Sequence, residues 1–422
     1  MADMEGLLQR LERAQQQYTT SFAGDGGRRQ PLHVVYGGAH LFKPETPKKL
    51  GALALEALTK FAATPHELGE ALGLPLHVAQ RVHPRLIEKL LREPVEDLRI
   101  DFEDGYGHRP DAEEDEHART SAAHYAKARV EGQLPAFSGL RIKPLSRELA
   151  PRALKTLSLF LAGCGAPKGE GLLVTLPKVV MAEQARVLVN ALDELGATSA
   201  RVELMIEAPQ SLAILRELYT ACGERLHAVH FGAYDYTAAL DLAASEQRLR
   251  HPTCDFARHQ MKVAFAGTSV FVSDGATTTF PVPIHRGATL NPVQEAENRT
   301  AVHSAWRASA DDIRHSLSNG LYQGWDLHPA QLVARFGTVF GFFIENLEPM
   351  TKRLKGFVDS LGQATLSGVS FDDAATGQGL LNFFLRGLSC GALTQAELTA
   401  TGLTADELAS RSFALVARNR RP

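Results

Sequence analysis

Short apolar runs alternate with longer segments of helical periodicity along most of the chain. Each run is bounded by Gly, Pro or Asp, which is typical of β-strands between turns. Eight runs have this form, at residues 33–38, 97–107, 139–145, 171–179, 201–209, 226–235, 268–275 and 322–329. Their alternation with helical segments predicts a parallel β/α architecture, and eight units in roughly 300 residues favour a closed barrel over an open sheet. We therefore predict an α/β fold, a (β/α)8 TIM barrel.

The same pattern divides the chain into three parts. Residues 1–32 form a polar, amphipathic N-terminal helical segment, 33–364 the barrel, and 365–422 a C-terminal helical extension. The connection between the first two predicted strands is too long for one helix, which predicts a helical insertion at about 64–95. The segment before the eighth strand, at 280–320, is also overlong and predicts a loop followed by helices.

Polar residues stand where most of the predicted strands end. They are Glu103, Asp104, Lys178, Glu207, Asp235, Asp274 and His328, and Arg141 lies inside the third strand. In a (β/α)8 barrel the chemistry is carried at the carboxyl ends of the strands, so these side chains are the candidates for a shared site. Strand alternation places Glu207 on the same face as Glu203 and Met205, which we expect to point into the barrel.

Glu207 and Asp235, on adjacent strand ends, offer carboxylate oxygens of the kind that Mg²⁺ or Mn²⁺ prefers. Zinc would require a His or Cys cluster, and none is visible in the sequence. A cation held there could chelate the carboxylate and keto oxygens of a 2-oxo acid and act as a Lewis acid. Arg141 could stabilise the oxyanion that develops during carbon–carbon cleavage.

Composition narrows the choice of partner and compartment. The chain is 44% hydrophobic and 22% charged with a formal net charge of −3, which argues against bulk electrostatic binding to nucleic acid or an anionic membrane. No apolar run approaches the roughly 20 residues that span a bilayer. The four cysteines form no CxxC pair and the N-terminus lacks an apolar signal stretch, so we expect a cytoplasmic protein.

Six segments of the predicted barrel form a recognisable series between residues 97 and 331: DFEDGYG, GLRIKP, LPKV, ELMIEAPQSL, HFGAYDYTAAL and GWDLHPAQL. In this order they resemble the D-L-E-D, V-R-I-N, L-P-K, I-E-T, F-G-A-x-D and I-H-P-x-Q segments of the citrate lyase β-subunit/HpcH–HpaI aldolase superfamily. The resemblance implies a phosphoenolpyruvate/pyruvate-type TIM barrel and a divalent-metal-dependent carbon–carbon lyase or aldolase. It also implies a homo-oligomer, because relatives usually assemble.

The resemblance assigns roles to individual residues. Glu207 and Asp235 match the metal-binding glutamate and aspartate, and Arg141 matches the arginine that contacts the oxo or enolate oxygen of the substrate. Glu103 and Asp104 match an acidic pair beneath the site that positions water or metal-bound groups. These assignments make Arg141, Asp104 and Glu103 candidate catalytic residues.

Three further residues complete the candidate site. Lys178 matches a lysine usually tied to the acidic pair and is counted with the catalytic residues. Asp274 partly matches the aspartate of a D-G-P-Y segment, and we group it with Arg141 and His328 as substrate-binding.

The chain departs from that family at several places. The first strand reads HVVYGGAHLFKP where the family often has R-S-x-L-F-V-P, and Lys143 stands where Asn is frequent. Together with the helical insertion and the C-terminal extension, these departures argue against a coenzyme A thioester substrate more than they argue against the metal site. His40 is a candidate for the basic histidine of HpaI-type aldolases only by its place after the first strand.

Each assignment has a structural alternative. A lone carboxylate at a strand end commonly caps a helix, and Arg141 could pair with Asp104 or Glu207 inside the barrel. A regular strand would turn Glu103 and Asp104 to opposite sides, and we expect Asp104 to face inward. Nearby acids would raise the pKa of Lys178, which favours an ion-pair role over a Schiff base. His328 could simply fill the barrel mouth.

The Gly-rich stretch GCGAPKGEG at 163–171 precedes a predicted strand, where a phosphate-binding loop would follow one. It is therefore interpreted as an ordinary loop.

The leading hypothesis is a Mg²⁺-dependent carbon–carbon lyase or aldolase that acts on a 2-oxo acid, or on a malyl- or citryl-CoA-like substrate, through a metal-stabilised enolate. A second hypothesis keeps the metal and changes the reaction to thioester hydrolysis or phosphoenolpyruvate-type chemistry. A third is a non-catalytic binding or assembly subunit.

Overall fold

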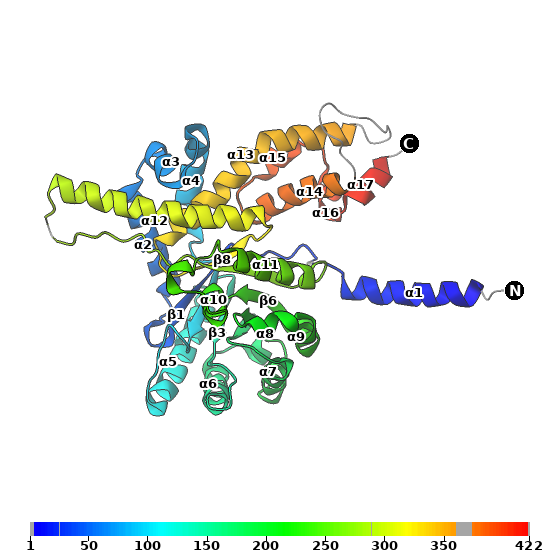
Figure 1. Cartoon of the computed structure of the whole chain (residues 1–422), viewed down its shortest axis with the longest axis horizontal. Helices are drawn as coiled ribbons and strands as arrows, with labels where there is room; N and C mark the ends of the chain where they lie inside the picture. Colours follow the sequence, from blue (N-terminus) through cyan, green and yellow to red (C-terminus); the bar gives the residue numbers. More distant parts are fainter. Residues whose placement is uncertain (1–3, 25, 288, 360–373, 421–422) are drawn as a thin grey trace.

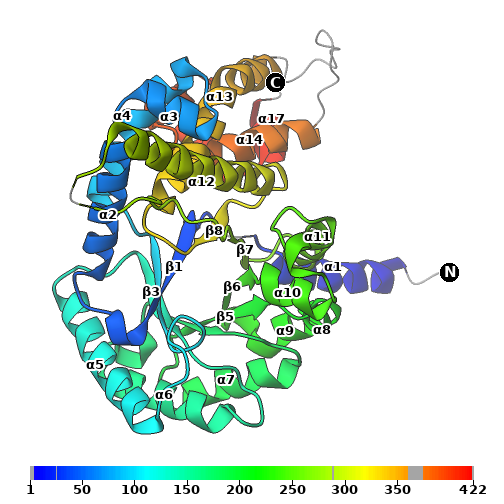
Figure 2. The same cartoon turned by 60° about the vertical axis from the view of Figure 1, so that its left-hand side comes forward.

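Eight parallel strands close into a barrel in chain order, from β1 to β8 (Figures 1 and 2). The computed structural model describes residues 4–24, 26–287, 289–359 and 374–420. The strands are β1 His33–Gly38, β2 Asp97–Asp101, β3 Phe137–Arg141, β4 Leu172–Leu176, β5 Arg201–Ile206, β6 Leu226–Phe231, β7 Phe271–Ala276 and β8 Gln323–Asp326. β1 pairs with β8 as well as with β2, which closes the barrel. The predicted (β/α)8 fold is confirmed.

Helices follow the strands and cover the outside of the barrel (Figure 2). They are α5 Asp111–Val130, α6 Ala150–Gly163, α7 Ala182–Glu194, α8 Pro209–Ala213, α9 Leu215–Cys222, α10 Ala233–Ala239, α11 Pro252–Phe265, α12 Pro292–Ser318 and α13 Gln331–Asp359. Short 3₁₀ turns lie at Ala39–Leu41, Pro167–Gly169, Gly223–Arg225 and Ala244–Glu246. The Gly-rich stretch at 163–171 is part of a connection between α6 and β4, as a loop.

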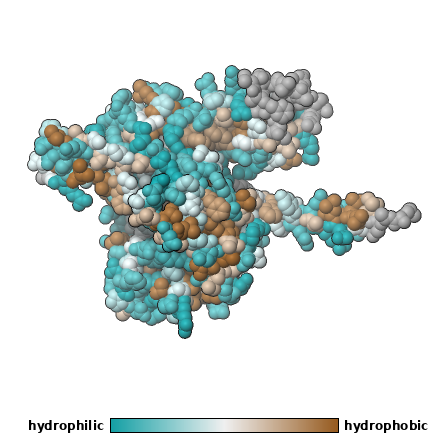
Figure 3. All heavy atoms as spheres, viewed as in Figure 1, coloured by the Kyte–Doolittle hydropathy of each residue, from teal (hydrophilic) through white to brown (hydrophobic). Residues whose placement is uncertain are grey.

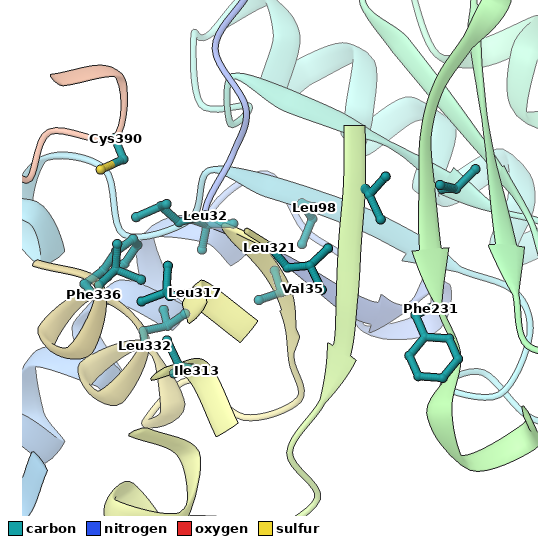
Figure 4. Packing of buried hydrophobic residues seen from close by; sticks show 14 of the residues in the cluster. Leu32, Val35, Leu98, Phe231, Ile313, Leu317, Leu321, Leu332, Phe336 and Cys390 are labelled. Carbon is teal, nitrogen blue, oxygen red and sulfur yellow. The ribbon is translucent and has the colours of Figure 1, made fainter. Parts of the chain in front are cut away.

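The core lies between the strands and this helical layer because alternate strand residues face outward. In β5, Val202, Leu204 and Ile206 are fully buried and belong to the main hydrophobic cluster. Figure 4 shows Leu317 of α12 and Phe336 of α13 packed near Leu321, which lies two residues before β8. The opposite set of strand residues therefore fills the barrel interior, as expected from the period of two.

The long connection after β1 contains three helices: α2 Thr46–Phe61, α3 Pro65–Leu72 and α4 Leu76–Arg92. Thr64 and Glu67 form a reciprocal capping box at the start of α3, and Gly73 ends that helix with a positive φ of 72°. α3 packs against α4 and α12, and α4 also contacts α13. The connection thus lies beside the barrel on the α12 and α13 side (Figure 1).

After α13, the described chain resumes with α14 Ala374–Ser389, α15 Gln395–Thr399, α16 Ala405–Ser410 and α17 Phe413–Arg420. α14 packs on α13, which joins these C-terminal helices to the barrel. The predicted start of the extension at residue 365 falls outside the described residues. No helix in the described ranges is long and apolar enough to cross a membrane.

At the other end of the chain, α1 Met4–Ser21 extends away from the barrel (Figure 1). None of its residues is buried. Figure 3 shows hydrophobic residues exposed on it, and Leu7, Leu8 and Leu11 are each more than half exposed, at 52%, 58% and 53%.

Candidate active site

The loop after β2 is folded around one buried carboxylate, Asp101. Asp101 is fully buried, and its two oxygens accept hydrogen bonds from the backbone N–H groups of Glu103, at 3.0 Å, and Gly105, at 2.8 Å. Strand β2 therefore ends at Asp101. Residues 102–107, which we expected to belong to the same run, form a turn and loop instead. Asp101 was not among the predicted site residues, although it alternates with Asp97 and Arg99 in DLRID and so shares their inward face.

Arg141, the last residue of β3, is held by this loop. Its side chain donates from Nε to Asp101 Oδ1 at 2.7 Å, and its Nη1 lies 3.0 Å from Glu103 Oε2. The guanidinium is only 1% exposed and lies 4.7 Å from the ring centroid of Tyr36. The ion-pair partners of Arg141 are therefore Asp101 and Glu103, and not Asp104 or Glu207.

Glu103 and Asp104 have different environments. Glu103 is 9% exposed, whereas the Asp104 side chain is 64% exposed. Burial raises the pKa of Glu103 above its ordinary value. Burial is the largest influence on Asp104 and raises its pKa, but the charges of Lys178 and Arg141 and the hydrogen bonds together outweigh it, so the net shift is downward. Our expectation that Asp104 faces inward is wrong, because β2 ends two residues before Glu103 and strand alternation no longer applies there.

Lys178 joins the acidic loop to Glu207. Its Nζ contacts Glu103 and lies 3.3 Å from Asp104 Oδ2, while its backbone N–H donates to Glu207 Oε1 at 2.6 Å. The backbone of Lys178 has a positive φ of 51°, the left-handed conformation that aims this N–H at the carboxylate. Burial lowers the pKa of Lys178, but the Glu103 hydrogen bond and the acidic charges raise it more. The ammonium of Lys178 therefore forms ion pairs, which is the role that the sequence favoured over a Schiff base.

Asp235 lies close enough to Glu207 for its charge to shift the pKa of Glu207. Glu207 follows β5 and is 4% exposed, and Asp235 is exposed in the first turn of α10. Burial, and then the charge of Asp235, raise the pKa of Glu207 to about 7. Lys178 and Arg141 act in the opposite direction. Glu207 is thus within electrostatic range of Asp235, Lys178 and Arg141, which come from neighbouring strand ends.

A glycine on the neighbouring strand end makes room for Glu207. A Cβ added to Gly232 would lie 2.5 Å from Glu207 Oε2. The backbone N–H of Gly232 donates to the carbonyl oxygen of Ile206 at 3.0 Å, which holds the two chain segments together. The carboxylate of Glu207 is thereby fixed between Gly232 on one side and the N–H of Lys178 on the other.

The residues present fit a hard divalent cation better than a soft one. Within the described ranges no group of three or more His, Cys, Asp or Glu side chains could hold a metal. Glu207 and Asp235 form a pair, and Mg²⁺ typically takes one or two protein carboxylates and completes its shell with water and ligand. A cation between them would also offset the repulsion that raises the pKa of Glu207.

Asp274 and His328 do not join this group. Asp274 is 1% exposed, and its Oδ1 accepts hydrogen bonds from Arg258 Nε and from the N–H of Gly275, both at 2.8 Å. Its other oxygen accepts from Ser316 of α12, so the side chain faces the helical layer. The predicted substrate-binding role of Asp274 stays a prediction, which this orientation does not support. His328 is half-buried after β8, and its ring stacks on Phe280 with centroids 5.8 Å apart.

His40 lies beside the acidic loop, within an aromatic cluster. Its ring is 5.6 Å from that of Tyr106, whose hydroxyl is 2.8 Å from Nδ1 of His117. Nδ1 of His40 is buried and has no hydrogen-bond partner in the part of the chain that the structure describes. Burial, with Arg109 and His117, lowers the pKa of His40. Tyr106 and His117 were not predicted, because only the turn after Asp101 brings them to His40.

Beneath the candidate site, the barrel interior is filled by a buried charge network. Arg99 donates from Nε to Glu203 Oε2 at 2.9 Å and from Nη2 to Glu203 Oε1 at 2.6 Å, and also contacts Asp97. Thr175 donates to Glu203 Oε2 at 2.7 Å, and His230 Nε2 lies 3.4 Å from the same oxygen. These residues support the floor of the site, since buried charges require close partners.

Solved structures show how widely this barrel is shared. A citrate lyase from Burkholderia xenovorans LB400 is 18% identical with a TM-score of 0.58, and the match covers 89% of this chain and 97% of that one. The CitE protein from Mycobacterium tuberculosis, in complex with magnesium, acetoacetate and coenzyme A, is 14% identical with a TM-score of 0.49, covering 86% and 99%. A malate synthase from Haloferax volcanii is 13% identical with a TM-score of 0.47, covering 93% and 98%.

At these identities the first match establishes a common fold, in line with the resemblance of the sequence motifs. No curated protein sequence matches the chain. A family model described as a domain of unknown function, DUF6986, matches residues 11–416.

Proposed function

The chain belongs to the family described as a domain of unknown function, DUF6986, and we propose that it is a Mg²⁺-dependent carbon–carbon lyase or aldolase acting on a small 2-oxo acid. The observation that carries this proposal is the pairing of Glu207 with Asp235 at the carboxyl end of the barrel, with Arg141 and Lys178 around them. Carboxylates, an arginine and a lysine converging at that end are the groups that 2-oxo acid chemistry requires.

Glu207 and Asp235 would hold the cation, Mg²⁺ or Mn²⁺. When bound, it would supply Lewis-acid polarisation of the keto oxygen of the substrate. Lys178 acts as a positioning residue: its backbone N–H fixes Glu207 Oε1, and its ammonium holds Glu103 against the loop. The orientation of the metal-binding carboxylate is therefore set before any ligand arrives.

Arg141 would donate to the oxygen that gains negative charge when the carbon–carbon bond breaks. Its Nη1 is 3.5 Å from Met205 Sδ, a weak acceptor on β5 two residues before Glu207. That edge of the guanidinium therefore faces the Glu207 side of the barrel and can exchange the sulfur for an oxygen. Asp101 keeps the guanidinium in place through its Nε bond at 2.7 Å.

The decisive test compares the wild-type protein with a Glu207→Gln, Asp235→Asn double variant. We expect the variant to lose lyase activity by more than roughly a hundredfold, because Lewis-acid polarisation contributes several kcal/mol to such reactions. Binding of Mn²⁺, followed by calorimetry, should be lost together with activity. The matched control is Glu183→Gln, Asp193→Asn, which makes the same charge change at exposed residues of α7.

Full activity in the Glu207, Asp235 double variant would refute the proposal. Product analysis with malyl-CoA, citramalyl-CoA and free 4-hydroxy-2-oxo acids separates the substrate classes. Release of coenzyme A without carbon–carbon cleavage would favour thioester hydrolysis, and absence of metal binding to the wild-type protein would favour a non-catalytic binding subunit.

A further inference from the structure

A pocket lies at the amino end of the strands, opposite the candidate active site. It has a volume of about 370 Å³ and is lined by residues at or near the first positions of β3 to β7, together with the segment before β1. In a (β/α)8 barrel the chemistry is carried at the other end, so this pocket is separate from Glu207 and Asp235.

Positive charge gathers in this pocket. Arg28 and Arg201 both line it, and Arg28 also stands over the ring of Phe271, 5.0 Å from the centroid. Arg201 donates only to backbone carbonyl oxygens, of Leu226 at 3.4 Å and Glu224 at 3.5 Å, and no carboxylate pairs with it in the described part of the chain. Burial and then the charge of Arg28 lower the pKa of Arg201, and the charge of Glu203 acts in the opposite direction.

A buried imidazole completes the polar lining. His227 is 5% exposed, and its Nδ1 has no hydrogen-bond partner among the residues that the structure describes. Its ring is held between Phe137 and Phe271, with centroids 5.7 and 5.4 Å away. Burial lowers the pKa of His227 to about 3, so the ring is neutral and can present one N–H donor.

Arg29, which pairs with Glu93 and Glu96, and Ser199 also line the pocket, and most of the remaining wall is apolar. Phe137 and Phe271 flank His227, and Leu172 and Leu173 line the same space. A wall of this kind excludes a fully hydrated inorganic ion and favours a ligand with a compact hydrocarbon part.

We propose that this pocket binds a small organic anion, a carboxylate or phosphate monoester with a compact apolar body. The acidic group would lie between Arg28 and Arg201 and accept the N–H of His227, and the apolar body would rest on Phe137 and Phe271. Guanidinium groups bind both kinds of oxyanion through paired hydrogen bonds, so the two chemistries share one site.

The experiment measures binding of phenyl phosphate, benzoate and inorganic phosphate by calorimetry, with EDTA present so that no metal occupies the candidate active site. We expect phenyl phosphate or benzoate to bind the wild-type protein and the Glu207→Gln, Asp235→Asn variant equally. Arg201→Gln should weaken binding roughly tenfold, because it removes a charge-assisted hydrogen bond. Ala136→Glu, at an exposed rim position of the pocket, should also weaken it by placing a carboxylate at the entrance.

Arg248→Gln serves as the matched control, since Arg248 is 57% exposed, pairs with Glu246 and lies outside the pocket. Thermal unfolding confirms that each variant is folded. If Arg201→Gln does not fold, the Ala136→Glu variant still tests the pocket, because Ala136 is exposed. The proposal is overturned if no probe binds the wild-type protein, or if both pocket variants bind as the wild type does. Equal affinity for inorganic phosphate and phenyl phosphate would overturn the proposal that the ligand has an apolar body. The ratio of benzoate to phenyl phosphate affinity identifies which acidic group the site prefers.

Discussion

Single side chains at the strand ends take their positions from charged partners on neighbouring elements. Glu103 is held by Arg141 and Lys178, whereas Asp274 is turned toward the helices by Arg258. Buried charges must be paired, so the nearest cation decides which carboxylates can reach a ligand. The residue type at a strand end therefore identifies a candidate site residue, and its ion-pair partner determines whether the side chain faces the site.

Asp326 at the end of β8 gives a pH-dependent test of this rule. It accepts from Arg335 Nη2 at 2.9 Å and lies 3.1 Å from His33 Nδ1. Burial would raise the pKa of Asp326, but Arg335 and His33 lower it to about 2. A depressed carboxyl pKa stabilises the folded state above the unfolded-state pKa of about 3.9, and this contribution is lost as the pH falls toward 2.

We therefore expect Asp326→Asn to lower the free energy of unfolding at neutral pH, with a pH-dependent part of about 2 kcal/mol. The difference from the wild type should shrink as the pH falls through the acid range, measured by denaturant unfolding. Asp311→Asn, at an exposed carboxylate 3.9 Å from Arg250, is the control and should show little change. If the difference in the free energy of unfolding between the wild type and Asp326→Asn stays constant with pH, the lowered pKa of Asp326 is contradicted.

At the scale of elements, the turn from β6 into α10 places Asp235 while leaving space for Glu207. Gly232 lies at that turn, and any side chain there would meet Glu207 Oε2. We expect Gly232→Ala to displace the Glu207 carboxylate, weakening Mn²⁺ binding measured by calorimetry and costing about 1–3 kcal/mol of stability. Gly379→Ala on α14, where nothing lies within 4 Å, is the control. Unchanged metal binding in Gly232→Ala would show that Glu207 tolerates the methyl group.

The barrel was predictable from the sequence because its signal is periodic and local. Eight short apolar runs bounded by turn residues specify the strands, and alternation put Glu207 and Met205 on the inward face, beside the buried Arg99–Glu203 pair. What failed depends on contacts that strand alternation does not describe. The loop after β2 turns because the Asp101 side chain accepts from backbone N–H groups two and four residues later, which ends the strand early. Asp274 faces outward because Arg258, on the separate element α11, lies behind it.

At the scale of the whole molecule, the barrel is joined to helices on one side and leaves α1 projecting on another (Figures 1 and 2). The C-terminal helices are joined to the barrel where α14 packs on α13. The ring centroids of Phe343 and Phe383 lie 5.1 Å apart at this contact. α1 has no buried residue. The homo-oligomer expected from the sequence stays a prediction, to be measured by light scattering of the full chain.

Deleting residues 1–21 is therefore expected to leave the unfolding temperature of the barrel within about 2 °C of the wild type, because little apolar burial is lost. Phe22 is kept, since Arg216 lies 5.4 Å from its ring and Gly267 packs beside it. A larger drop would mean that α1 contacts another molecule or another part of the chain in solution.

The projection of α1 has a consequence for its own conformation. An 18-residue helix standing in water is close to the limit at which helices persist without tertiary support, since most helical stability comes from packing an apolar face. Leu7, Leu8 and Leu11 supply such a face but the barrel does not cover it. Order in this segment is thus uncoupled from order in the barrel, and it depends on whatever surface those leucines meet.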